Sequence, residues 1–202
     1  MSHAVPKSHA VLKSHAVPKS HAKLKYISLL FLPKMSKRPT FYLDGKPIRA
    51  GGCLFYVLKD GKREYLLRNT KWPKPNWSDI GGKTDKTDTT FMDTIVREVA
   101  EETNFKLLSC HHNKTEAIDA LYSLLNTAEE AYYDDRSKYI TLLCEVSNQV
   151  RNLPMNRFGL REGTDKMDHY YRWTHVKHLK RHAMHPRLRF HPDYNDIFKK
   201  TI

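Results

Sequence analysis

The sequence predicts an α/β domain behind a low-complexity tail, and three segments carry this prediction. Two strand-like runs, Cys53–Leu58 and Glu64–Arg68, flank Asp60-Gly61, which is a hairpin pattern. The run Tyr139–Val146 is predominantly apolar and predicts a buried strand. The residues Met92, Ile95, Val96 and Val99 recur with the period of an amphipathic helix. Strands and helices mixed in this order indicate an α/β architecture.

The other elements follow the same periodicities. Strands are predicted at Lys106–Ser109 and Tyr170–Trp173, helices at Ile118–Leu125, Val176–Ala183 and Pro192–Lys199, and loops at Trp72–Asp79 and Arg151–Gly163. A chain of 202 residues is long enough for one domain with a real core and an extra segment. We assign residues 35–202 to a single domain that ends in a basic helical extension.

Residues 1–34 form the extra segment. They contain four near-copies of a six-residue unit of the SHAVPK type, which begin at Ser2, Ser8, Ser14 and Ser20. A period of six matches neither a helix nor a strand, and the prolines interrupt any helix, so the sequence predicts a disordered tail. We expect Met35 to be the functional start.

The cysteine content and the N-terminal sequence indicate where in the cell the protein is expected. Three widely spaced cysteines, Cys53, Cys110 and Cys144, suggest neither a disulfide framework nor a zinc site, so we expect a cytoplasmic or nuclear protein. No acid precedes Asp44, as in a mitochondrial targeting peptide, but the repeat and its prolines argue against that reading. The apolar run Tyr26–Pro33 is too short to cross a membrane as a helix.

The central helix has its own start signal and packing face. Thr90 and Asp93 form a candidate capping box. The apolar stripe comprises Met92, Ile95, Val96 and Val99. Off this stripe lie Glu98, Glu101 and Glu102, which share one helix face because residues three and four apart are neighbours. A cluster of carboxylates indicates a hard divalent cation, Mg²⁺ or Mn²⁺, and the alternative is a solvated acidic helix end.

The residues around the cluster favour a metal site over a solvated helix end. Gly81-Gly82, which we expect to turn tightly and approach a ligand, Asp88 and Arg97 precede the glutamates at characteristic distances. Here the chain resembles the Nudix hydrolase family, whose signature is a glycine, five residues, Glu, seven residues, then Arg-Glu-aliphatic-x-Glu-Glu-x-Gly-aliphatic. The fitting positions are Gly82, Arg97, Glu98, Val99, Glu101, Glu102 and, as an apolar stand-in, Phe105.

Three features depart from the signature. Asp88 stands where the family has Glu, and eight residues rather than seven separate it from Arg97. A shorter side chain and an extra residue can compensate each other. Asn104 replaces the glycine after the helix, and Asn tolerates the left-handed conformation that often ends a helix.

The resemblance covers about Arg38 to Lys180 and implies an α/β/α sandwich with a mixed sheet. It implies Mg²⁺-dependent hydrolysis, with Mn²⁺ as an alternative, of the pyrophosphate in a nucleoside diphosphate linked to another moiety. The metal ligands it implies are Glu98, Glu101, Glu102 and the Gly82 backbone. Arg97 would orient the glutamates, and Asp88 would pair with Arg97. Candidates for the general base are Glu98, Glu162, Asp165 and Asp168.

The substrate class is left open. A net charge of +13 favours polyanions, and basic residues alternate with aromatic ones between Asp168 and Asp193, as in RNA-binding surfaces. The loop Gly82-Lys83-x-x-Lys86 resembles that of mRNA decapping members, which act on capped RNA. Trp72 and Trp77 could stack a guanine, or pack in the core. The alternative to an enzyme is an inactive Nudix-fold module that binds RNA or a nucleotide. The sequence does not indicate an oligomeric state.

Overall fold

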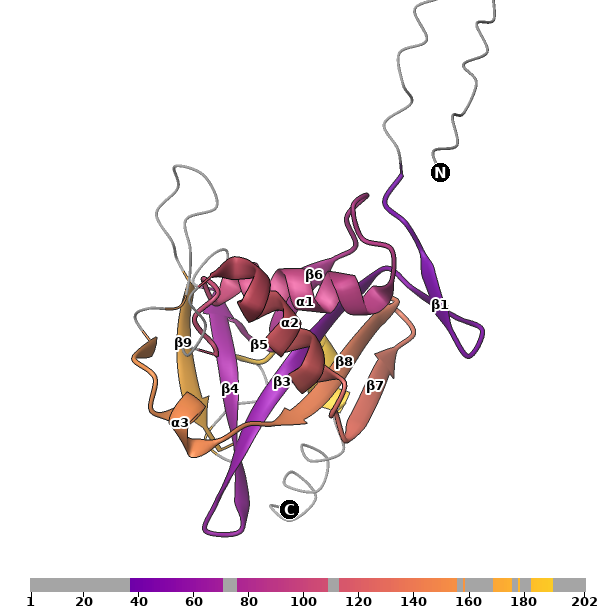
Figure 1. Ribbon diagram of the computed structural model, residues 1–202. Coiled ribbons are helices and arrows are strands. Elements are labelled where there is room, and N and C mark those ends of the chain that lie inside the picture. Colours follow the sequence, from indigo (N-terminus) through magenta and orange to yellow (C-terminus); the bar gives the residue numbers. More distant parts are fainter. Residues whose placement is uncertain are drawn as a thin grey trace, which may run out of the picture. The chain divides into compact units, whose positions relative to one another are not determined.

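The structure is a computed structural model that describes residues 37–70, 76–108, 113–155, 158, 169–175, 178 and 183–190 (Figure 1). The chain divides into two units, Met1–Met35 and Ser36–Ile202, and every described residue belongs to the second. The predicted tail, Cys110 and the helix Pro192–Lys199 lie outside the described residues, as does most of Val176–Ala183.

A mixed seven-stranded sheet is built around the long strand β3, Ala50–Lys59. Along one edge β3 pairs in parallel with β8, and along the other it pairs antiparallel with β4 and β6. The further strands of this sheet are β4 (Lys62–Thr70), β5 (Asn76–Ser78), β6 (Ile80–Lys83), β7 (Glu130–Asp134), β8 (Tyr139–Glu145) and β9 (His169–Thr174). A separate ladder joins β1 (Phe41–Leu43) to β2 (Lys46–Ile48). The predicted mixed sheet is confirmed.

Local signals account for the β3–β4 hairpin and for helix α1 (Phe91–Glu102). Asp60 and Gly61 have φ of 51° and 68°, the left-handed values that a tight hairpin turn requires. At α1, Thr90 and Asp93 form the predicted capping box. The helix ends at residues of positive φ, among them Asn104 at 55°.

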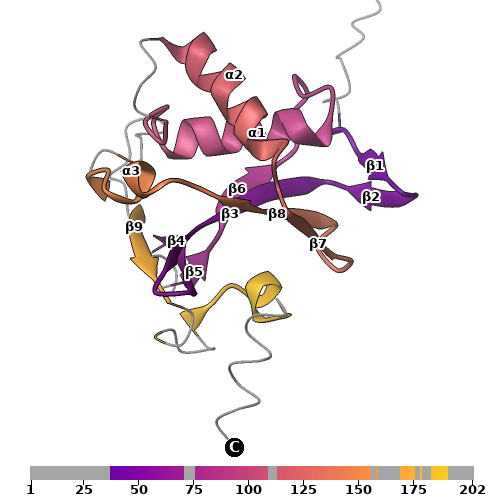
Figure 2. The ribbon, with the colours of Figure 1, turned by 60° about the horizontal axis from the view of Figure 1, so that its bottom comes forward.

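Apolar side chains fill both faces of the main sheet. On one face, Ile95, Val96 and Val99 of α1 pack with helix α2 (Lys114–Leu125) against β3 and β8. A fully buried aliphatic side chain contributes about 1.5–3 kcal/mol, so this face anchors the helix firmly. The opposite face holds a smaller cluster that includes Met184 and Leu188. Figure 2 shows α1 and α2 above the sheet and the short 3-10 helix η4 (Pro186–Phe190) below it.

The sandwich therefore differs in detail from the predicted one. Within the described residues, the second face of the sheet is covered by the segment around η4 rather than by an α-helix. One further short helix, α3 (Asn148–Arg151), follows β8. No described helix has the length and apolarity needed to span a membrane. Cys53 and Cys144 are buried free thiols.

Three local predictions were wrong. Residues 106–108 form no strand, because two consecutive left-handed residues, Asn104 and Phe105, lead the chain into a turn. Asn76–Ser78 is strand β5 rather than loop, because it pairs with β4. Gly81-Gly82 does not turn but lies extended in β6, opposite Gly51-Gly52 of β3. A Cβ at Gly81 would lie 2.3 Å from the Gly52 Cα, so glycine permits close strand contact there.

Candidate functional site

Arg97 is the centre of the candidate site. Its Nη1 donates to Glu98 Oε1 at 3.0 Å and to Glu101 Oε2 at 3.2 Å. Its Nη2 donates to the Lys83 carbonyl at 2.8 Å, which ties α1 to the end of β6. One guanidinium therefore gathers two of the three predicted carboxylates beside the glycine-containing strand.

Asp88 occupies the other side of Arg97. Its carboxylate accepts from Arg97 Nε at 3.0 Å and Nη2 at 3.1 Å. Asp85 and Asp88 close a tight turn, in which the Asp85 N–H donates to Asp88 Oδ2 at 2.7 Å and the Asp88 N–H to the Asp85 carbonyl at 3.0 Å. This turn lies just before Asp88 and holds its carboxylate, and the shorter acid still reaches the arginine across the eight residues that separate them.

Burial and hydrogen bonding shift the pKa of the Asp88 carboxyl in opposite directions. Burial alone raises the pKa of its carboxyl, but hydrogen bonds from Arg97, the Asp85 N–H and the Thr94 hydroxyl outweigh it and leave the pKa below its usual value. For Arg97, burial opposes the charge, yet Asp88 and Glu98 raise the pKa of the guanidinium above its usual value. Both groups are therefore charged in the folded protein near neutral pH.

Gly82 lies directly against Glu98. A Cβ at Gly82 would meet three atoms of the Glu98 carboxyl group at 2.3 to 2.5 Å, closer than real Cβ contacts allow. With any side chain at this position, the Glu98 carboxylate would have to move away from β6. The predicted role of the glycine as a point of close approach thus has a definite partner.

We expect Gly82→Ala to lower catalytic activity by at least about tenfold, because the new methyl group would displace the Glu98 carboxylate. The φ of Gly82 is not positive, so the backbone itself tolerates alanine. Steady-state kinetics and urea denaturation of the variant measure the two effects separately. A variant with wild-type turnover would show that this contact has no role in catalysis.

Glu102 has different partners from the other two glutamates. Its carboxylate forms an ion pair with Arg68 of β4 and accepts from the Gly81 N–H at 3.2 Å. The Tyr171 hydroxyl donates to the Glu102 carbonyl at 2.7 Å, and burial raises the pKa of Tyr171 to about 12. The sequence analysis did not predict Arg68, and it considered Tyr171 only as part of the basic and aromatic stretch between Asp168 and Asp193. The only signal for Arg68 is a charged residue directly after an apolar run of a strand.

The oxygen donors fit a hard divalent cation in their chemistry, and two of the three carboxylates converge on one point. Glu98 and Glu101 could hold such an ion together with the backbone of Gly82. Within the described part of the chain, however, no group of three acidic, histidine or cysteine side chains is arranged to hold a metal. The ion pair with Arg68 accounts for the position of Glu102.

No family model and no curated protein matches the chain. Among solved structures, a C. elegans Ap4A hydrolase binary complex aligns at 16% identity with a TM-score of 0.36, over 64% of this chain and 81% of that one. A second structure of C. elegans Ap4A hydrolase has the same identity and coverage and a TM-score of 0.34. The NUDIX domain of Shewanella oneidensis NrtR, complexed with ADP ribose, aligns at 14% identity and a TM-score of 0.33, over 64% and 73% of the chains.

The chain is thus similar to solved structures that include a NUDIX domain, at low sequence identity and with TM-scores of 0.33 to 0.36.

The remaining predicted residues of the Nudix-like site are spread over the molecule. Lys83 and Lys86 are exposed, whereas Trp77 is 8% exposed and packs edge-on against Tyr170. Trp77 thus belongs to the second apolar cluster, which is the packing role weighed in the sequence. Four predicted residues lie outside the described residues: Trp72, Glu162, Asp165 and Asp168.

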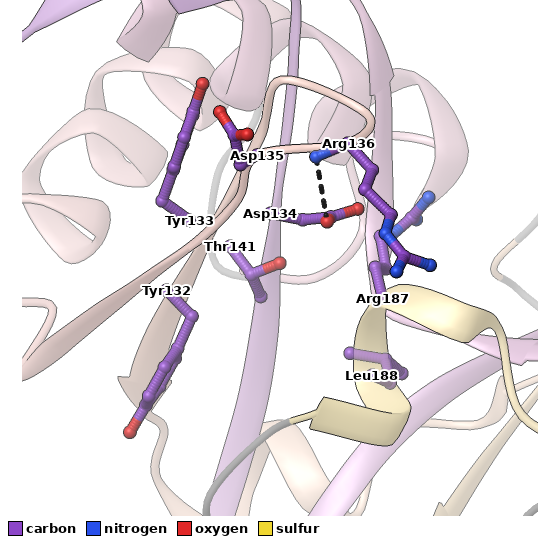
Figure 3. Close-up of a pocket in the computed structure, with 8 residues that line it drawn as sticks. All are labelled: Tyr132, Tyr133, Asp134, Asp135, Arg136, Thr141, Arg187 and Leu188. Atoms are coloured by element: carbon purple, nitrogen blue, oxygen red, sulfur yellow. Dashed lines mark hydrogen bonds between the residues drawn. The ribbon is translucent and has the colours of Figure 1, made fainter. Parts of the chain in front are cut away.

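Besides a cavity of about 250 Å³ whose lining includes Asp88, Arg97 and Glu101, the described residues line two larger cavities. The larger, about 660 Å³, is lined by Gly82 and Lys83 together with several other basic residues. The smaller, about 410 Å³, is lined by Tyr132, Tyr133 and a pair of aspartates (Figure 3). Arg187 lines both cavities.

Proposed function

We propose that this chain is a Nudix hydrolase that cleaves the phosphoric anhydride of a nucleoside diphosphate linked to another moiety. The observation that carries the proposal is the arrangement around Arg97, which binds Asp88 and gathers Glu98 and Glu101 against Gly82. A solvated acidic helix end would not require a buried Asp88 that pairs with an arginine nine residues later.

The residues of the site would perform distinct tasks. Glu98, Glu101 and the Gly82 backbone would hold Mg²⁺ or Mn²⁺, with Glu102 joining them if it leaves Arg68. The bound ion would supply neutralisation of phosphate charge and acidification of water. Arg97 fixes the two glutamates, and Asp88 fixes Arg97. Among the residues that the structure describes, Glu98 is the candidate for the general base. The other candidates remain Glu162, Asp165 and Asp168.

We propose a nucleotide polyphosphate or capped RNA as the substrate. The basic loop that contains Lys83 and Lys86, together with the net charge of +13, supports a polyanion. For RNA, the basic C-terminal region would add contacts. Of its aromatic residues, Tyr171 is buried and Trp173 packs against the main core, while Tyr170 is 43% exposed and available for stacking. A cytoplasmic or nuclear location would give access to such substrates.

One observation favours the alternative, an inactive Nudix-fold module that binds RNA or a nucleotide. The ion pair between Arg68 and Glu102 leaves the described site one carboxylate short of the predicted set. In such a module, Arg68 would replace part of the positive charge that a metal supplies.

A panel of substrates distinguishes the hydrolase from the binding module. Capped RNA, cap dinucleotide, nucleoside triphosphates, ADP-ribose, dinucleoside polyphosphates and inositol pyrophosphates would each be incubated with Mg²⁺ or Mn²⁺, with EDTA as the control. We expect metal-dependent cleavage of at least one class, with the products identifying the broken bond. Binding of these compounds without any product would support the module instead.

A further inference from the structure

Arg68 of β4 and Glu102, the last residue of α1, form an ion pair. Their side chains are 17% and 18% exposed, so solvent screens the pair only in part. Within the part of the chain that the structure describes, Glu102 is the only hydrogen-bonding or ion-pair partner of the Arg68 side chain, whose Nε is buried without a hydrogen bond. The guanidinium therefore depends on this one carboxylate to compensate its charge.

The other arginine of the site distributes its charge more widely. Arg97 pairs with three carboxylates, whereas Arg68 pairs with Glu102 alone. The three partners of Arg97 are Asp88, Glu98 and Glu101. Among the three glutamates predicted to bind a metal, Glu102 is thus the one whose charge is most completely neutralised.

Both oxygens of the Glu102 carboxylate have partners. Oε1 pairs with Arg68, and Oε2 accepts from the Gly81 N–H at 3.2 Å. A divalent ion at this carboxylate would lie beside the guanidinium, and two cations at one carboxylate repel each other. Tyr171, which lies opposite Arg68 in the β4–β9 ladder, donates to the Glu102 carbonyl at 2.7 Å and holds the end of α1. An exchange of partner therefore requires only the Glu102 side chain to turn.

We propose that Arg68 competes with the divalent ion for Glu102 and so sets the metal concentration at which the site fills. In the metal-free protein the arginine compensates a mostly buried carboxylate. At higher metal concentration, Glu102 leaves the arginine and becomes a ligand together with Glu98 and Glu101. Control of hydrolysis by this exchange rests on the proposed function, whereas the competition itself is a property of metal binding.

Mn²⁺ titration of the metal-free, full-length protein tests the competition, with the free ion measured by electron paramagnetic resonance and no substrate present. We expect Arg68→Gln to bind Mn²⁺ at least about tenfold more tightly than the wild type, because the competing charge is gone. Arg68→Met, which keeps the apolar length of the side chain, should show the same gain and replaces Arg68→Gln if that variant is unstable.

Arg151→Gln is the matched control. It removes the same charge from another partly buried ion pair, with Glu64, which lies roughly 13 Å from Arg68 along β4. This distance exceeds the Debye length of about 8 Å at physiological ionic strength, so we expect the Mn²⁺ affinity of the wild type.

A double-mutant cycle separates competition at Glu102 from a general effect of charge. Glu102→Gln should lower the Mn²⁺ affinity more in the Arg68→Gln background than in the wild type, because the carboxylate is available to the ion only when the arginine is absent. Equal losses in the two backgrounds would overturn the proposal. The same holds for an unchanged Mn²⁺ affinity in both Arg68→Gln and Arg68→Met, or for no Mn²⁺ binding by any of the proteins.

The proposed competition and the proposed hydrolase activity can fail separately. If Mn²⁺ binds as expected but no member of the substrate panel is cleaved, the hydrolase is rejected and the role of Arg68 is retained. If substrate is cleaved but Mn²⁺ affinity does not respond to the loss of Arg68, only the competition is rejected.

Discussion

Glu98→Gln is expected to lower the rate of anhydride hydrolysis by about 10²- to 10⁴-fold, the range associated with a positioned acid or base. Glu98 contacts Gly82, pairs with Arg97 and is the described candidate for both metal ligand and general base. Glutamine keeps the shape of the side chain but removes its charge. The measurement is single-turnover kinetics at saturating Mg²⁺, with urea denaturation to check folding.

Glu116→Gln on α2 is the matched control, because Glu116 is exposed and the substitution keeps the oxygen that accepts from Asn113. We expect it to retain wild-type turnover. If Glu98→Gln hydrolysed substrate as fast as the wild type, Glu98 would have no catalytic role, and the acidic face of α1 would be only a solvated surface.

Arg97→Gln is expected to lower the free energy of unfolding by about 3–5 kcal/mol at neutral pH, since removal of one partner leaves a buried charge without compensation. The Asp88 side chain is 3% exposed and depends on Arg97 for two of its hydrogen bonds. Urea denaturation of the wild type and the variant measures the difference. Asp88→Asn added to Arg97→Gln should restore part of the loss, because the uncompensated charge is then gone.

The pH dependence of stability has a definite sign. In the wild type the pKa of Asp88 lies below its usual value, so the pairing stabilises the fold above the ordinary carboxyl pKa and is lost as the pH falls through the lowered pKa. The difference in free energy of unfolding between the wild type and Arg97→Gln should therefore shrink as the pH falls. A variant as stable as the wild type at neutral pH, with no such pH dependence, would contradict the buried ion pair.

Elements with local signals could be predicted from the sequence. The turn at Asp60-Gly61 and the cap at Thr90 each lie within a few residues of the structure they determine. Strands β5 and β6 could not, because three or four residues show too little periodicity to indicate a strand and form one only when a partner strand supplies the hydrogen bonds. The glycines of β6 resembled a turn for the same reason. Their actual partners, Gly52 and Gly51, lie 29 and 31 residues earlier in the chain.

The candidate site also combines residues that a local pattern indicates with residues that only the fold brings together. The cluster of acids on α1 follows from helical spacing, whereas Arg68 reaches Glu102 only after β4 is placed beside the helix. The contact between Asp79 and Arg187 spans 108 residues, so no local pattern indicates it. The basic cavity next to Gly82 is likewise assembled from residues on five separate segments.

Hydrolysis in H₂¹⁸O with Mg²⁺ tests the central claim most directly. For the substrate class that the panel identifies, mass spectrometry of the products should find one ¹⁸O atom in a phosphate group, in the wild type and not in Glu98→Gln. Such a result requires attack of water on phosphorus in a reaction that depends on Glu98. Tight binding of nucleotide or capped RNA without any labelled product, in every member of the panel, would contradict the account and identify a binding module.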